Sequence, residues 1–420
     1  MTSLTERAQA VLRANDHGGY TVPSARLYPF QWNWDSGFVA LGWATFDEAR
    51  AWLELESLVG AQWDDGMIPH IVFHKTSTGY SPGAEVWGTE GRRPPTSGIS
   101  QPPVLATVVR RLLEEARDRG LAEAKAEALT PALLSWHRWW RRARDPEGSG
   151  LVVIHHPWES GRDNSPDWDA ALALVPVTRN RYERRDLALV DAGQRPHQHE
   201  YDRYLYLVDL FRDLDYDSDC LSRDCPFQVV DVGTNAILHR ADLDLIALAE
   251  RFGHEAEARE LAARAARTRR AFADLWHPAH GLYLSFDRRA GAMIEVPSAA
   301  GFLALFGRIP GPDMAAILAE TAARWTERTR FALPTMQPDH DLFEPRRYWR
   351  GPVWAHFNWL IAEGFAAYGH NAIADRLRVD MRRLIEAGGF FEYYDPQDGT
   401  GCGGGEFSWT AASALFWAVR

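Results

Sequence analysis

Apolar residues recur every three or four positions along most of the chain, which is the spacing of one face of an α-helix. Several of these segments end at a glycine, as a left-handed helix terminus requires. The pattern predicts helices over 34–45, 47–62, 101–120, 123–144, 199–215, 231–253, 255–278, 297–309, 311–325, 349–369, 371–389 and 407–420. No region alternates apolar and polar residues over the length of a strand, so an all-α fold is expected.

The connections between these helices are of two kinds. Some are short turns, whereas others are long and rich in glycine, proline and aromatic residues, namely 63–100, 145–198, 279–296, 326–348 and 390–406. Loops longer than about 15 residues are uncommon in compact domains unless they carry function. The alternation predicts an (α/α)6 barrel, a ring of six helical hairpins with the long loops forming a lid over one face. No linker divides the chain, so residues 1–420 are expected to form a single catalytic domain, with loop insertions at about 63–100 and 145–198.

Composition and charge limit the partners that the chain can have. The net charge of −11, without a dense cluster of arginine among aromatic residues, argues against nucleic acid. Residues 1–16 indicate a polar helix without an apolar signal segment, and nowhere do 18 apolar residues follow one another. A soluble cytoplasmic protein without a membrane partner is expected, and both a monomer and a homo-oligomer stay open. The three cysteines, Cys220, Cys225 and Cys402, are expected to be free thiols.

Carboxylates occur beside aromatic residues in three segments outside the regular helical pattern. These segments are HHPWESGRDNSPDWD (155–169), YPFQWNWDSG (28–37) and FFEYYDPQDGTGCGGGEFSWT (390–410). A solvated acidic turn or an aromatic core would explain each segment alone, but neither explains acids, glycines and aromatic rings together. Carboxylates bind sugar hydroxyls while flat rings cover the apolar faces of a pyranose, so the pattern is typical of a carbohydrate-processing cleft.

Two of these segments resemble the motifs of known glycoside hydrolases. WESGRDNSPDWD (158–169) resembles the acid motif of the trehalases and of the processing α-glucosidase I family, in which a Glu-Ser-Gly-x-Asp run carries the general acid. FEYYDPQDGTG (391–401), followed by FSWTA (407–411), resembles the matching motif whose first glutamate is the base. In length and detail the chain is most similar to the bacterial mannosylglycerate and glucosylglycerate hydrolases, from about Tyr28 to Trp417.

The resemblance implies that Asp163 is the general acid and Glu392 the general base of an inverting exo-acting hydrolase. It also implies a set of residues around the sugar: Tyr28, Trp32, Trp34, Asp35, His70, Gln101, Trp158, Tyr348, Trp349 and Trp354. Tyr80, Arg195 and Tyr201 match positions that contact the acid aglycone in the glycerate-cleaving members. Glu406, where some relatives are expected to have Gln, is predicted to bind the leaving group or to help to position water.

The residues themselves agree with these two catalytic roles. An acid must be protonated and a base ionised at the same pH, which requires two environments. In a pocket lined by tryptophans such as Trp158, desolvation would favour the neutral form of Asp163. Glu392 belongs to a glycine-rich loop with many bare backbone N–H groups, which suit an ionised carboxylate, and the glycines would let this loop close over a small substrate.

Other interpretations stay open beside this one. His70 and His74 have the i, i+4 spacing of a zinc pair but no acidic third ligand, and the aspartates of 213–224 lack the Gly and Glu of a calcium loop, so no metal or other cofactor is expected.

A hydrolase of a neutral disaccharide, such as an α-glucosidase or trehalase, is the second hypothesis for the function. A silent sugar-binding protein or an isoprenoid-type cyclase is the third. Arg195 favours mannosylglycerate or glucosylglycerate as the substrate, because a carboxylate aglycone needs a cation.

Overall fold

Six helices form a closed inner ring in the computed structural model, which describes residues 3–76 and 79–419. The ring consists of α2 (Asn33–Ala44), α5 (Leu105–Glu115), α10 (Val232–Arg251), α12 (Leu303–Phe306), α14 (Ala355–Ala367) and α16 (Ser408–Ser413). Each helix packs against the next in this order, and α16 packs back against α2. The ring is therefore closed by the two ends of the chain.

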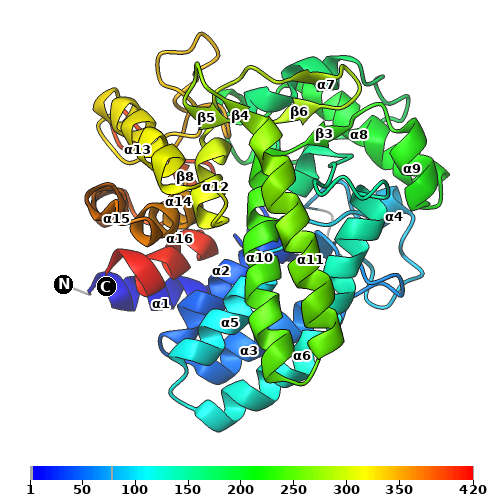
Figure 1. Ribbon diagram of the computed structural model, residues 1–420, viewed down its shortest axis with the longest axis horizontal. Helices are drawn as coiled ribbons and strands as arrows, with labels where there is room; N and C mark the ends of the chain where they lie inside the picture. The colour runs from blue at the N-terminus through cyan, green and yellow to red at the C-terminus, as the bar shows by residue number, and fades with distance from the viewer. Residues whose placement is uncertain (1–2, 77–78, 420) are drawn as a thin grey trace.

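A second layer of helices surrounds the ring and completes an (α/α)6 barrel. It consists of α1 (Leu4–Ala14), α3 (Glu48–Val59), α6 (Arg119–Arg144), α11 (Glu255–Ala271), α13 (Pro312–Glu327) and α15 (Asn371–Gly388). Figure 1 shows α1 and α16 side by side although they come from opposite ends of the chain. The predicted all-α barrel is confirmed.

The apolar pattern of each helix matches its layer. In α2 every residue from Asn33 to Trp43 is buried, because an inner helix is enclosed on all sides. In α11 only Ala258, Leu261, Ala265 and Thr268 are buried, at spacings of three or four that define one inward face. The remaining surface of α11 carries the charged residues.

One of the twelve helices that were predicted to form the barrel lies outside it. All twelve predicted helices are present with shifted ends, but α8 (Gln198–Asp213) packs against α4 (Ala84–Trp87) outside the ring. The N-terminal helix α1 takes the twelfth place in the barrel instead. Its capping box at Ser3 and Glu6 fixes its start, and Val11 and Leu12 are buried.

The long segments 63–76, 79–100 and 145–198, together with residues 199–230, form a cap with its own apolar cluster, as Figure 1 shows around α4, α7 and α8. Phe73, Trp87, Trp158, Tyr204 and Phe227 belong to this cluster. The cap contains α4, α7 (Asp169–Ala173), α8, α9 (Ser218–Asp224) and four 3-10 turns, η1 (Pro157–Ser160), η2 (Pro166–Trp168), η3 (Asp186–Ala188) and η4 (Ala192–Gln194). Both predicted insertions therefore cover the same end of the barrel.

Short antiparallel strands of two residues each tie the loops together. The pairs are β1 (Gln31–Trp32) with β2 (Ile71–Val72), β4 (Trp276–His277) with β5 (Leu282–Tyr283), β8 (Tyr393–Tyr394) with β9 (Gly401–Cys402), and β6 (Phe286–Asp287) between β3 (Val229–Val230) and β7 (Ala292–Met293). Two of these pairs lie beside the site: β1 leads into α2, and β8 and β9 pair within the glycine-rich segment 390–406.

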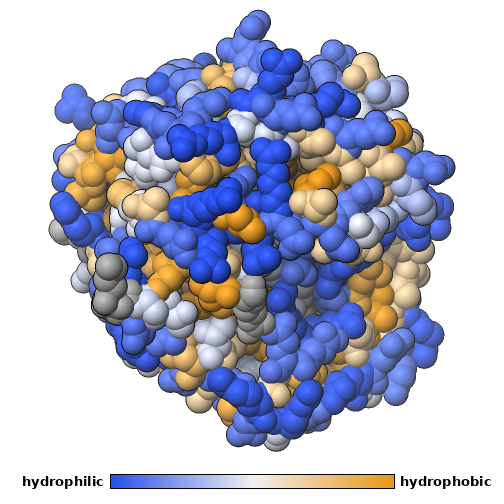
Figure 2. Space-filling model, turned by 90° about the vertical axis from the view of Figure 1, so that its left-hand side faces the viewer, coloured by the Kyte–Doolittle hydropathy of each residue, from blue (hydrophilic) through white to orange (hydrophobic). Residues whose placement is uncertain are grey.

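One face of the outer surface is mainly polar. Figure 2 shows the face that includes α1, α13 and α15, where hydrophilic residues dominate and apolar residues form small separate groups. Cys220, Cys225 and Cys402 are free thiols, as predicted. Over residues 3–76 and 79–419, no helix is both long enough and apolar enough to cross a membrane.

Candidate active site

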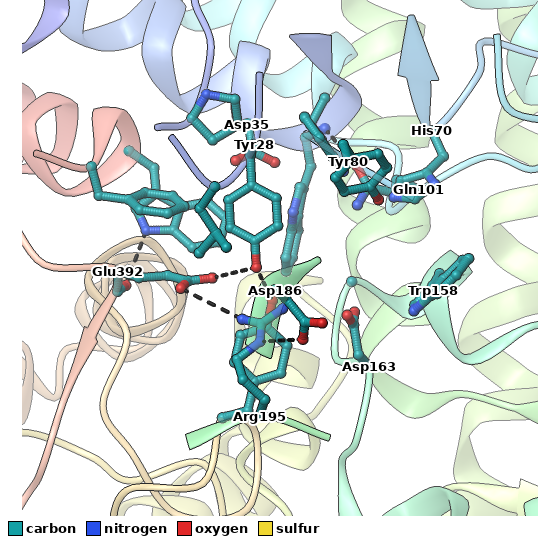
Figure 3. Close-up of a pocket in the computed structure, with 18 of the residues that line it drawn as sticks. Tyr28, Asp35, His70, Tyr80, Gln101, Trp158, Asp163, Asp186, Arg195 and Glu392 are labelled. Atoms are coloured by element: carbon teal, nitrogen blue, oxygen red, sulfur yellow. Dashed lines mark hydrogen bonds and ion pairs between the residues drawn. The ribbon is translucent and has the colours of Figure 1, made fainter. Parts of the chain in front are cut away.

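A cavity at the junction of barrel and cap brings together most of the predicted site residues (Figure 3). Its lining includes Tyr28, Trp32, Trp34, Asp35, His70, Tyr80, Gln101, Trp158, Asp163, Arg195, Tyr201, Tyr348 and Glu392. They come from segments up to 364 residues apart, the separation of Tyr28 and Glu392. The catalytic and binding roles of these residues stay predictions, but their convergence on one cavity is an observation.

The acid motif holds one free carboxylate among several paired ones. Glu159 is bound by Arg144 at 2.6 Å, and both side chains are buried. Arg162 pairs with Asp167 at 3.1 Å and with Asp231 at 2.7 Å. These ion pairs fix the loop from inside, so Asp163 is the acid of residues 159–167 that lines the cavity.

Asp163 lies in an environment that favours its protonated form. Desolvation in the cavity raises its pKa to about 7, with Arg195 opposing this shift and Glu392 adding to it. Its backbone carbonyl accepts a hydrogen bond of 2.8 Å from the Tyr204 hydroxyl, which anchors the loop to α8. Figure 3 shows Asp163 and Glu392 entering the cavity from opposite sides.

Glu392 is completely buried and is held by several donors. The Tyr28 hydroxyl donates to Oε1 at 3.0 Å, and the backbone N–H of Gly404 donates to Oε2 at 3.2 Å. Nη1 of Arg195 lies 3.7 Å from Oε2. Burial raises the pKa of Glu392, whereas Arg195 and the Gly404 and Tyr28 hydrogen bonds favour its ionised form.

Arg195 occupies the floor of the cavity between the two catalytic candidates. Its Nε donates to Asp186 at 3.1 Å, and its guanidinium lies 4.3 Å from the centre of the Tyr348 ring. Nη1 is buried, and within residues 3–76 and 79–419 it has no hydrogen-bond partner. A buried guanidinium N–H without a hydrogen bond is costly, so beside its ion pair with Glu392 this group can still bind a hydrogen-bond acceptor.

The opposite wall carries polar groups suited to sugar hydroxyls. Asp35 lies in the first turn of α2, and burial raises its pKa well above the usual range. Oε1 of Gln101 accepts the backbone N–H of Trp34 at 3.2 Å, which fixes the orientation of its amide. Burial lowers the pKa of His70 well below its usual value, so this imidazole is neutral at ordinary pH.

Three residues that were predicted to bind substrate, Trp349, Trp354 and Glu406, do not line the cavity. Trp349 and Trp354 stack on each other at 4.1 Å, and the Tyr348 ring packs edge-on against Trp354, so these tryptophans lie behind Tyr348. Glu406 has an exposed side chain and a backbone φ of 50°. Because the backbone at Glu406 has this left-handed conformation, the adjacent Phe407 lines the cavity instead of Glu406.

The cavity also includes residues that the sequence analysis did not single out. Among them are Leu27, Arg185, Asp186, Phe407 and Trp409. Trp409 belongs to the motif FSWTA and could have been found there. Asp186 lies in a charged segment, RYERRD, that looks like any solvated loop, so no local pattern identified it. In the described part of the chain, no group of three or more His, Cys, Asp or Glu side chains could hold a metal ion.

The helical barrel and the two acids that face each other across an aromatic cavity define a glycoside hydrolase. Residues 28–410 match the family model of the mannosylglycerate hydrolase MGH1-like glycoside hydrolase domain. The chain belongs to this family.

Curated relatives and a solved structure match over nearly the whole chain. A mannosylglycerate hydrolase of Thermus thermophilus is 52% identical over 98% of this chain and 99% of its own length. A glucosylglycerate hydrolase of Mycolicibacterium hassiacum is 39% identical over 99% of this chain and 98% of its own. The crystal structure of a GH63 mannosylglycerate hydrolase from Thermus thermophilus, in complex with Tris and D-glycerate, superposes with a TM-score of 0.96 at 51% identity and 99% coverage of both chains.

Proposed function

We propose that this enzyme hydrolyses the α-glycosidic bond of mannosylglycerate or glucosylglycerate and releases the hexose and glycerate. The observation that carries the proposal is the buried Nη1 of Arg195, a cavity-lining residue, because this atom has no hydrogen-bond partner in the described part of the chain. A glycerate carboxylate would provide the missing acceptor. Relatives named for both substrates, at 52% and 39% identity, support the same substrate class.

The proposed reaction is a single displacement with inversion at the anomeric carbon. Asp163 donates its proton to the glycosidic oxygen as the bond to the anomeric carbon breaks. Glu392 accepts a proton from the water that attacks the same carbon from the opposite face. The products are the hexose and glycerate, whose new hydroxyl carries the proton from Asp163. The two carboxyl groups end in exchanged protonation states, which solvent resets.

The environments of the two acids suit these roles. A pKa of about 7 leaves a large share of Asp163 protonated near neutral pH. The donors around Glu392, from Tyr28 and Gly404, hydrogen-bond best to an ionised carboxylate. The two acids therefore differ in the contacts they make: Glu392 has two hydrogen-bond donors that stabilise its charge.

Tyr80, Arg195 and Tyr201 form the proposed aglycone end of the cavity. Beside the ion pair that Nη1 of Arg195 forms with Glu392, a neutral disaccharide would offer this group only a hydroxyl. A carboxylate can instead form charge-assisted hydrogen bonds with the guanidinium. This difference favours a glycerate substrate over trehalose or a neutral α-glucoside.

The test compares the variant Arg195→Ala on substrates with a glycerate aglycone and with an uncharged glycerol aglycone. We expect kcat/KM for the glycerate substrate to fall about 10- to 100-fold, because charge-assisted hydrogen bonds are lost, while the glycerol substrate changes much less. Arg185→Ala is the matched control, since Arg185 lines the same cavity but pairs with Glu183 and is 46% exposed at its side chain. Equal losses on both substrates, or wild-type enzyme that cleaves only trehalose, would contradict the proposal.

A further inference from the structure

One carboxylate on the cavity wall, that of Asp186, holds two arginine side chains. Arg195 donates from Nε to Oδ2 at 3.1 Å. Arg184 donates from Nη2 to Oδ2 at 2.6 Å and from Nε to Oδ1 at 3.1 Å, which is a two-point contact. All three side chains are nearly buried, with exposures of 4% for Arg184, 5% for Arg195 and 11% for Asp186.

An aromatic ring covers each of the two arginines that pair with Asp186. The guanidinium of Arg184 lies 4.3 Å from the centre of the Tyr201 ring, and that of Arg195 lies 4.3 Å from the centre of the Tyr348 ring. Each planar cation is therefore held by a ring on its face and by Asp186 at its edge. Arg184 also donates to the backbone carbonyl of Pro196, next to Arg195 in the chain, at 2.7 Å.

The contact with Asp186 decides which edge of Arg195 faces the cavity. A guanidinium presents its N–H groups in a rigid plane, so fixing Nε and the ring plane fixes the direction of the remaining groups. Nη1 then lies on the Glu392 side of the cavity, 3.7 Å from Oε2 of Glu392, and no described residue forms a hydrogen bond with it. Burial opposes ionisation of Asp186, but Arg195 and Arg184 together lower its pKa, so the acceptor stays charged at neutral pH.

We propose that Asp186 is a positioning residue that orients Arg195 for the aglycone carboxylate and thereby sets the preference for an acidic aglycone. The inference rests on the proposed function, since it concerns the same cavity. Asp186 acts through Arg195 and makes no chemical step of its own. Its removal frees Nε of Arg195, and the guanidinium then loses the geometry that leaves Nη1 directed at the substrate.

The experiment measures kcat and KM of Asp186→Asn on a glycerate glycoside and on its uncharged glycerol analogue. We expect kcat/KM for the glycerate substrate to fall about 10-fold, mainly through a higher KM, because a correctly aimed charge-assisted contact is lost. The glycerol analogue should change less than about 3-fold, so that the preference for the charged aglycone shrinks. Glu183→Gln is the matched control, an acid-to-amide change in the same segment at a side chain that is 69% exposed.

A double-mutant cycle separates positioning from a general structural effect. If Asp186 acts through Arg195, adding Asp186→Asn to Arg195→Ala should cause no further loss on the glycerate substrate. Additive losses, or equal losses on both substrates, would overturn the proposal.

Calorimetric titration with free D-glycerate gives a second readout that needs no turnover. If Asp186→Asn fails to fold, Arg184→Gln takes its place and should also weaken the binding of D-glycerate. Wild-type enzyme that cleaves neither glycerate substrate would contradict the proposed function instead, and wild-type behaviour of Asp186→Asn would contradict only the role of Asp186.

Discussion

Gly403 lies directly against the carboxylate of Glu392. A Cβ atom at residue 403 would lie 2.2 Å from Oε2 and 2.8 Å from Cβ of Glu392, and the backbone φ of Gly403 is +71°. Both the contact and the positive φ exclude a side chain at this position. The glycine-rich loop therefore lets the backbone approach the proposed base closely enough for the N–H of Gly404 to bind it.

Gly403→Ala should inactivate the enzyme while the fold survives. The added methyl must displace Glu392 or the loop, and a misplacement of about 1 Å at a catalytic group can cost about 100-fold in rate. Steady-state kinetics would show the loss mainly in kcat. Gly405→Ala is the control in the same loop, because its Cβ would meet only Phe391, at 3.9 Å. Similar activity of the two variants would mean that Glu392 does not need its observed position.

Stereochemistry tests the roles of the two acids together. If Asp163 protonates the leaving oxygen while Glu392 activates water on the other face, an α-linked substrate yields the β-hexose first. Proton NMR on a fresh reaction should show the β anomer before mutarotation mixes the two. The same mechanism requires room for a water, so a substrate-bound crystal structure should place the carboxyls roughly 6.5–9.5 Å apart. An α product, or a spacing near 5 Å, would indicate a covalent intermediate instead.

The helices were predictable from sequence because their apolar residues recur at helical spacing, but the layer to which each helix belongs was not. The buried face of α8, which includes Tyr204, Leu205 and Val208, has the spacing of an ordinary barrel helix. That face packs against α4, which comes from a distant part of the chain. With four residues, α4 is too short to show a helical pattern in the sequence. Conversely, α1 looks polar because it buries few residues, yet those few suffice against α16. Membership in the barrel depends on these distant contacts.

A site residue could be predicted where a sequence motif identifies it. It could not be predicted where the backbone conformation decides whether its side chain faces the cavity. Asp163 followed from the acid motif, and it does line the cavity. Glu406 and Asp186 are both acids on long loops, and nothing local separates them. A positive φ directs Glu406 outward, whereas ion pairs with Arg184 and Arg195 hold Asp186 at the cavity wall. Local sequence patterns contain no information about these contacts, so they could not separate the two acids.

Glu159 belongs to the acid motif but should matter for stability more than for chemistry. Its carboxylate is fully buried with Arg144, so Glu159→Gln leaves an arginine without its counter-charge. Breaking such a buried pair costs about 3–5 kcal/mol of unfolding free energy. Glu123→Gln is the control, because Glu123 pairs with Arg251 at the surface, where a pair contributes about 0–1 kcal/mol. Urea unfolding of both variants would measure the difference, and equal values would contradict the structural role of Glu159.

Asp163→Asn should abolish turnover and yet raise the thermal stability at alkaline pH. The pKa of Asp163 rises from 3.8 to about 7 in the folded protein, chiefly through desolvation. Because the folded pKa is higher than the unfolded one, the folded state binds this proton more tightly, and its stability falls as pH rises between these two values. Above about pH 7 the wild-type enzyme has the full cost of a desolvated charge, which the neutral asparagine removes. Calorimetric scans should therefore show a Tm gain of a few degrees at about pH 8.5 and a smaller gain at about pH 5. A gain that is equal at both pH values, or a loss at about pH 8.5, would mean that Asp163 is not destabilised by burial.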